Sequence, residues 1–131
     1  MSDHTMIKLN EEQMRDFVAN GHISLKTNLP DDFHREVYET TEKAFERVGN
    51  PGNNILPMVP QLQQVFDHPQ ISGALTSILG ENYYLHPHRH CHFNKPSSEG
   101  QTLHKDSWSR FQHRTRWAMA FYYPQDTPVE R

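Results

Sequence analysis

Residues 83–93 read YYLHPHRHCHF, and the character of the sequence changes at this stretch. Apolar and polar side chains alternate along it, and alternation with a period of two is typical of a β-strand. Residues 101–106 (QTLHKD) alternate in the same way, and residues 116–123 (RWAMAFYY) are rich in the aromatic side chains that favour strands. The sequence therefore predicts a sheet from residue 83 onward.

The residues before this stretch carry the signals of helices. Asn10 and Gln13 have the spacing of a capping box, which predicts a first helix that ends at Gly21. Residues 22–26 (HISLK) then alternate as a short, half-buried strand would.

A second helix is expected to begin at a cap formed by Asp31 or Asp32 and to stop in the loop GNPGNN at residues 49–54. Proline suits the first turn of a helix, so two further helices are predicted at residues 60–67 and 69–79. The side chains of the second helix that are expected to face the core are Phe33, Val37, Thr41, Ala44, Phe45 and Val48.

Length and composition bound the fold class. The chain of 131 residues fits a single domain. Hydrophobic residues make up 34% of it, below the ~45–50% apolar usage of ordinary domains, which predicts a small core. With residues 1–82 mainly helical and residues 83–131 forming strands, the expected fold class is α+β.

Charge and cysteine content exclude several kinds of partner. Lys and Arg total 13 against 16 Asp and Glu, and the cationic residues are spread along the chain, so a nucleic-acid partner is not expected. No apolar stretch approaches the length that spans a bilayer, so no membrane association is expected. Cys91 is the only cysteine, which excludes an internal disulfide and favours a reducing, cytoplasmic location.

His104 and Asp106 are the most informative pair of side chains. On a strand, residues two apart project to the same side, so an imidazole and a carboxylate would lie next to each other. Such a pair makes up two of the three protein ligands in the facial triad of non-haem Fe(II) oxygenases. The local sequence leaves a second interpretation open, in which an exposed strand end carries the two side chains and they bond only to each other or to water.

A wider window of sequence resembles one protein family. Residues 92–108 (HFNKPSSEGQTLHKDSW), followed by residues 116–131 (RWAMAFYYPQDTPVER), resemble the phytanoyl-CoA dioxygenase family of Fe(II)- and 2-oxoglutarate-dependent dioxygenases. Residues 9–26 resemble the helix and strand with which such proteins open. The resemblance implies N-terminal helices packed on a partial double-stranded β-helix of the jelly-roll or cupin-like kind.

The resemblance also implies roles for individual residues. His104 and Asp106 match the first two Fe(II) ligands, while Cys91 and Phe121 match positions that border the pocket for 2-oxoglutarate. Dioxygen is the second cosubstrate, and the implied reaction is hydroxylation of a small-molecule substrate. A shift of register by one residue would put His92 in the place of Cys91, so the pocket-facing side of this strand stays open.

The sequence departs from the family near its C-terminal end. The family's distal iron-binding His and the Arg that binds 2-oxoglutarate follow the returning strand, and the sequence reaches Arg131 before either of them. The chain is therefore expected to be the N-terminal part of a truncated dioxygenase fold, active only as part of a longer enzyme.

The histidine-rich stretch allows further interpretations. His86, His88, His90 and His92 would share one side of a strand. They form either a polar wall or solvated face of the sheet, or the ligands of a non-catalytic, cupin-like module that binds Zn or Ni. The remaining alternative is a structural or interaction domain in which the His-x-Asp pair binds nothing.

Overall fold

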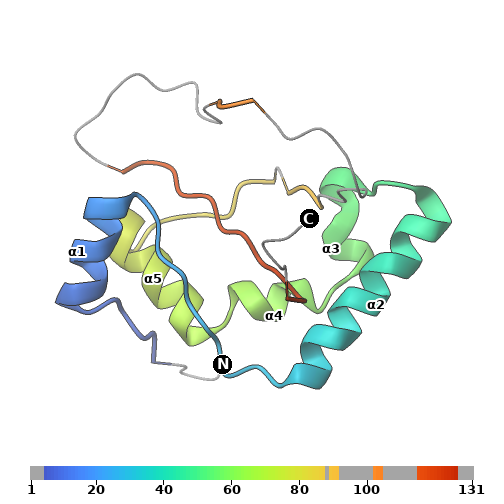
Figure 1. Ribbon diagram of the computed structural model, residues 1–131, viewed down its shortest axis with the longest axis horizontal. Helices are drawn as coiled ribbons and strands as arrows, with labels where there is room; N and C mark the ends of the chain where they lie inside the picture. Colours follow the sequence, from blue (N-terminus) through green and yellow to red (C-terminus); the bar gives the residue numbers. More distant parts are fainter. Residues whose placement is uncertain (1–4, 88, 92–101, 105–114, 127–131) are drawn as a thin grey trace.

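The computed structural model describes residues 5–87, 89–91, 102–104 and 115–126. All helices within these residues lie between 11 and 79 (Figure 1), and none of them combines the length and apolar character needed to cross a membrane. In chain order they are α1 (Glu11–Asn20), α2 (Asp31–Val48), the 3₁₀ helix η1 (Gly52–Asn54), α3 (Ile55–Met58), α4 (Leu62–Phe66) and α5 (Pro69–Leu79).

The predicted α+β fold with a partial double-stranded β-helix is wrong. None of the described residues lies in a strand, including residues 22–26, 83–87 and 115–126. Alternation predicts only that a backbone can be extended, whereas a strand also needs a neighbouring backbone with which it forms a hydrogen-bonded ladder. No backbone hydrogen bond joins residues 115–126 to another described residue, and the chain bends at Pro87. Residues 88, 92–101, 105–114 and 127–131 of the predicted β region lie outside the described part.

Local signals determine both ends of α1, as predicted. Asn10 Oδ1 accepts a hydrogen bond from the Gln13 N–H at 2.8 Å, and the Gln13 side chain accepts one from the Asn10 N–H at 3.0 Å. This reciprocal pair is the predicted capping box, and it satisfies two backbone donors at the helix N-terminus. Gly21 follows the helix with a φ of 73°, a left-handed conformation that glycine adopts without steric cost.

The start of α2 differs from the prediction, whereas its end agrees. Pro30 is the N-cap residue, and no side chain caps this helix. The predicted cap by Asp31 or Asp32 is wrong because both residues lie inside the first turn, where a carboxylate interacts favourably with the helix dipole. The helix ends at Val48, directly before the predicted loop.

Of the two later helices that were predicted from prolines, one has the predicted bounds and the other is shorter. The helix α5 has the predicted bounds, with Pro69 in its first turn. The helix predicted at residues 60–67 is shorter, since α4 covers only Leu62–Phe66. The predicted loop at residues 49–54 contains η1 and leads directly into α3, a helix that the sequence pattern did not predict.

A small hydrophobic core lies around α2 and α3. Two of the side chains expected on it, Val37 and Ala44, are buried, whereas Val48 is 53% exposed. The buried members of this α2–α3 core are Val37, Ala44, Ile55 and Val59, and the partly buried side chains packed against them are Phe33, Met58, Leu62, Cys91 and Tyr122. The last two come from the segments after residue 82, so this core holds those segments against the helices.

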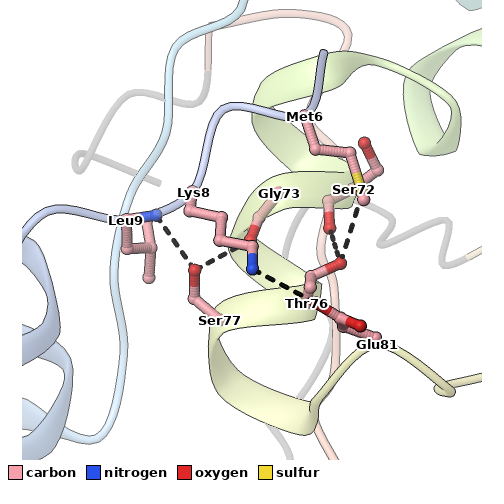
Figure 2. Close-up of polar contacts among 8 residues, drawn as sticks. All are labelled: Met6, Lys8, Leu9, Ser72, Gly73, Thr76, Ser77 and Glu81. Atoms are coloured by element: carbon pink, nitrogen blue, oxygen red, sulfur yellow. Dashed lines mark hydrogen bonds and ion pairs between the residues drawn. The ribbon is translucent and has the colours of Figure 1, made fainter. Parts of the chain in front are cut away.

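The N-terminal segment lies along α5 (Figure 2). The Ile7 N–H donates to the Pro69 carbonyl at 3.0 Å. The Leu9 N–H donates to Ser77 Oγ at 3.0 Å, as Figure 2 shows. The Ile7 backbone also comes so close to Gly73 that any β-carbon at residue 73 would overlap it. This face of α5 therefore requires a residue without a side chain.

We expect Gly73→Ala to destabilise the protein by about 1–3 kcal/mol, because the added methyl group must displace the Ile7 backbone. In an unobstructed helix the same change would stabilise by roughly 1 kcal/mol. The free energy of unfolding in urea measures the effect. A deletion of residues 1–9 serves as the control background, where the substitution should be neutral or stabilising. Stabilisation in the full chain would show that the N-terminal segment does not lie on α5.

Candidate functional site

His104 is the described half of the predicted metal-binding pair. Its side chain is exposed, and its Nδ1 lies 2.7 Å from the Thr102 carbonyl oxygen. A carbonyl oxygen can only accept, so Nδ1 carries the hydrogen and Nε2 of the neutral ring carries the lone pair. Histidines that bind metals commonly have this arrangement, in which the second ring nitrogen donates to a carbonyl or carboxylate. Asp106 lies outside the described residues.

The described part of the chain contains no other cluster of potential metal ligands. Within residues 5–87, 89–91, 102–104 and 115–126, no three His, Cys, Asp or Glu side chains converge as a metal site would require. His86 and His90 are both exposed, while the other two members of the histidine-rich stretch, His88 and His92, lie outside the described residues.

Cys91, one of the two residues expected to border a 2-oxoglutarate pocket, lies half-buried against the α2–α3 core. Burial raises the pKa of its thiol, and the nearby carboxylate of Glu42 raises that pKa further. The thiol therefore stays protonated at neutral pH, and a protonated thiol is a poor nucleophile and a poor metal ligand. The described geometry assigns Cys91 a packing role.

Phe121, the second residue expected at that pocket, is 64% exposed, whereas its neighbour Tyr122 packs against the α2–α3 core. The Tyr122 hydroxyl lies 2.7 Å from His34 Nδ1 on α2. Burial raises the pKa of the Tyr122 phenol to about 12, so the phenol keeps its proton and can donate it to this nitrogen. This pair was not predicted from the sequence, although alternation along residues 116–123 separates residue 122 from residue 121.

Of the described residues after 82, the segment of residues 83–87 and 89–91 is joined by side chains to residues 115–126 and to the helices. The His86 and Trp117 rings meet edge to face, with their centroids 5.3 Å apart. The Arg89 N–H donates to the Asn53 side-chain oxygen at 3.0 Å, which ties the first segment to η1. Together with the contact of Tyr122 with His34, these contacts hold the two segments against the helices, at His34 near the start of α2 and at Asn53 beyond its end.

An open cavity of about 290 Å³ lies at the N-terminus of α5. Inside it, His68 Nε2 lies 2.7 Å from Asn28 Oδ1, and His68 Nδ1 accepts a hydrogen bond from the Gln70 N–H at 3.3 Å. One ring nitrogen thus accepts and the other donates, which requires a neutral imidazole. The residues that line this cavity are Ile7, Lys26, Thr27, Asn28, His68, Pro69 and Gln70.

His68 should make stability depend on pH. Burial lowers the pKa of its imidazole below 6.5, so the unfolded chain takes up the proton first as the pH falls. The neutral His68 side chain makes its full contribution to the free energy of unfolding above pH 6.5. This contribution is lost as the pH falls toward the lowered pKa of the folded state. We expect His68→Asn, which keeps a cap acceptor but cannot titrate, to remove this part of the pH dependence of urea unfolding. His22→Asn, which changes an exposed histidine, is the control, and an equal effect of both variants would contradict the assignment.

Tyr122→Phe should lower the free energy of unfolding by about 0.5–1.5 kcal/mol, because it removes the hydrogen bond to His34 but keeps the ring on the core. Thermal or urea denaturation measures the loss. Tyr123→Phe is the matched control, since that side chain is 66% exposed and its change should have no effect. A double-mutant cycle with His34→Ala should show coupling between the two side chains, and additive effects would exclude the bond.

The described site residues are thus divided between two places. Cys91 packs against the α2–α3 core and Phe121 is the exposed neighbour of Tyr122 on that core, whereas His104 lies in a separate described stretch, residues 102–104, with its ring nitrogen against Thr102. Comparison of the chain with protein-family models, with curated proteins and with solved structures finds no match.

Proposed function

We propose that His104 and Asp106 supply two protein ligands to Fe(II) in a 2-oxoglutarate-dependent oxygenase of the phytanoyl-CoA dioxygenase type. The proposal rests on the resemblance of residues 92–108 and 116–131 to that family. The observation that supports it most directly is the contact of His104 Nδ1 with the Thr102 carbonyl, because it leaves the lone pair on Nε2, the nitrogen that would coordinate the metal. When bound, Fe(II) and 2-oxoglutarate would supply the dioxygen chemistry that hydroxylates a small-molecule substrate.

The donor set fits ferrous iron better than a softer metal. One imidazole nitrogen and one carboxylate are the ligand types of the two-His, one-carboxylate oxygenase site. A competing thiolate is disfavoured, because burial raises the pKa of Cys91. A 2-oxoglutarate pocket bordered by both Cys91 and Phe121 would have to be completed by residues outside the described part, since Phe121 is largely exposed.

The same proposal includes the cellular context. A single cysteine and the absence of an internal disulfide suit a reducing compartment, and we propose a cytoplasmic location. The substrate is proposed to be a small organic molecule, because the charged residues form no basic cluster that would attract a nucleic acid.

Anaerobic titration with Fe(II), followed by NMR, tests the metal site. Paramagnetic broadening should affect the His104 ring at lower Fe(II) concentrations than the other histidines. We expect His104→Ala and Asp106→Ala each to weaken Fe(II) binding at least about tenfold, since each removes one of two ligands. His86→Ala is the matched control and should leave the affinity unchanged. Addition of 2-oxoglutarate should produce a charge-transfer absorption band only if it binds to the same iron.

Two results would contradict the proposal. Fe(II) binding that is unaffected by Asp106→Ala would show that the His-x-Asp pair is not the site. Tight Zn or Ni binding that is lost in His86→Ala or His90→Ala would instead support a non-catalytic module that uses the histidine-rich stretch.

A further inference from the structure

Three segments that are far apart in the sequence meet around the open cavity of about 290 Å³ at the start of α5. Ile7 comes from the N-terminal segment, residues 26–28 from the run between α1 and α2, and residues 68–70 from the start of α5 (Figure 1). The bond of 2.7 Å between His68 Nε2 and Asn28 Oδ1 joins two of these segments. A cavity that several segments line with polar groups is a common setting for a small-molecule site, and this volume suits only a small ligand.

The charge at this cavity is positive. Among the described residues that line it, only Lys26 carries a formal charge, because the hydrogen bonds of His68 require a neutral imidazole. Within the described part of the chain, the Lys26 side chain forms no hydrogen bond or ion pair. The carboxylate of Asp67, next to His68 in the chain, does not line the cavity and accepts a hydrogen bond from Gln63 at 2.9 Å. The described lining therefore combines a cation with no carboxylate.

Neutral donors complete the wall of the cavity. His68 Nδ1 accepts from the Gln70 N–H, so His68 Nε2 carries the hydrogen and donates it to Asn28 Oδ1. This bond fixes the orientation of the Asn28 amide and leaves its Nδ2 group as a donor. The Thr27 and Gln70 side chains form no hydrogen bond with another described residue, so they can also donate. The first N–H groups of α5 already have acceptors in His68, so the side chains and not the helix end provide the donors.

We propose that this cavity binds a small organic anion, whose carboxylate or phosphate group pairs with Lys26 and accepts hydrogen bonds from Thr27 and Asn28. An unpaired ammonium group beside neutral donors is suited to an oxyanion, because hydrogen bonds to a charged acceptor are the strong ones. Ile7 and Pro69, which also line the cavity, can contact a short hydrocarbon part of the ligand. This site shares no residue with the proposed iron site and needs no metal, so it can be tested independently of the proposed oxygenase activity.

Titration of the full chain with sodium butyrate and, separately, with sodium phosphate at constant ionic strength tests the site. The backbone N–H signals of residues 26–28 and of Gln70 should shift in nitrogen–proton NMR spectra. The shifts should saturate with a dissociation constant in the millimolar range, since one ion pair and a few hydrogen bonds hold the ligand. Saturation by butyrate alone would identify a carboxylate ligand, and saturation by phosphate alone would identify a phosphate ligand.

Substitutions at the cavity test which side chains bind the anion. Lys26→Gln should weaken binding at least about tenfold, because it removes the charge that pairs with the ligand. Asn28→Asp should abolish binding, since it keeps an acceptor for His68 but adds a carboxylate that repels the anion. Lys43→Gln is the matched control, because it removes an exposed lysine from α2 and should leave the affinity unchanged.

The fold of each variant can be checked by circular dichroism, which should not change because Lys26, Asn28 and Lys43 are all exposed. Shifts that do not saturate with either anion would overturn the proposal. An equal loss of affinity in Lys26→Gln and Lys43→Gln would show an adventitious ion only, attracted by the overall charge. Unchanged binding in Asn28→Asp would exclude this cavity as the site.

Discussion

Two buried valines belong to the α2–α3 core, and this core holds segments from beyond residue 82 against the helices. Val37 is 1% exposed and Val59 is 0% exposed, and burial of each contributes roughly 1.5–3 kcal/mol. Cys91 and Tyr122 pack against the same core from segments far along the chain. Bringing such distant segments together costs loop entropy, which the side-chain contacts must offset. The Tyr122 hydroxyl and the His86 ring add a hydrogen bond and an aromatic contact to that packing.

The helices could be predicted from the sequence because their determinants are local. The capping box of α1 involves residues three apart, and α5 begins at a proline that lies next to its cap. The predicted strands were wrong for the opposite reason, since a strand exists only when a second backbone provides its hydrogen bonds. The alternation of residues 116–123 was nevertheless informative, because it separates inward from outward side chains even without a ladder. The close approach of Ile7 to Gly73 joins residues distant in the chain, and no sequence pattern indicates it.

In the candidate site, too, contacts between residues near in sequence differ from contacts between residues far apart in sequence. The contact of His104 with Thr102 spans two residues, and it places the hydrogen on Nδ1, as is common in histidines that bind metals. A complete metal site needs donors from separate parts of the chain, and their convergence cannot be derived from spacing. The pair formed by His34 and Tyr122 is of this second kind, with its members on α2 and in residues 115–126. A shift of the alternation by one residue would turn Phe121 instead of Tyr122 toward the core, and the sequence alone does not fix this register.

The small core and the exposed aromatic side chains near the C-terminal end belong to one composition. With hydrophobic residues at 34% of the chain, the buried cluster contains valine, alanine and isoleucine, while Phe121 and Tyr123 remain largely accessible. Aromatic side chains bury about 150–250 Å² each, so leaving them in water forgoes the largest hydrophobic contributions available to this chain. The inward turn of Tyr122 and the outward turn of its neighbours thus link the stability of the fold to the surface that the fold presents.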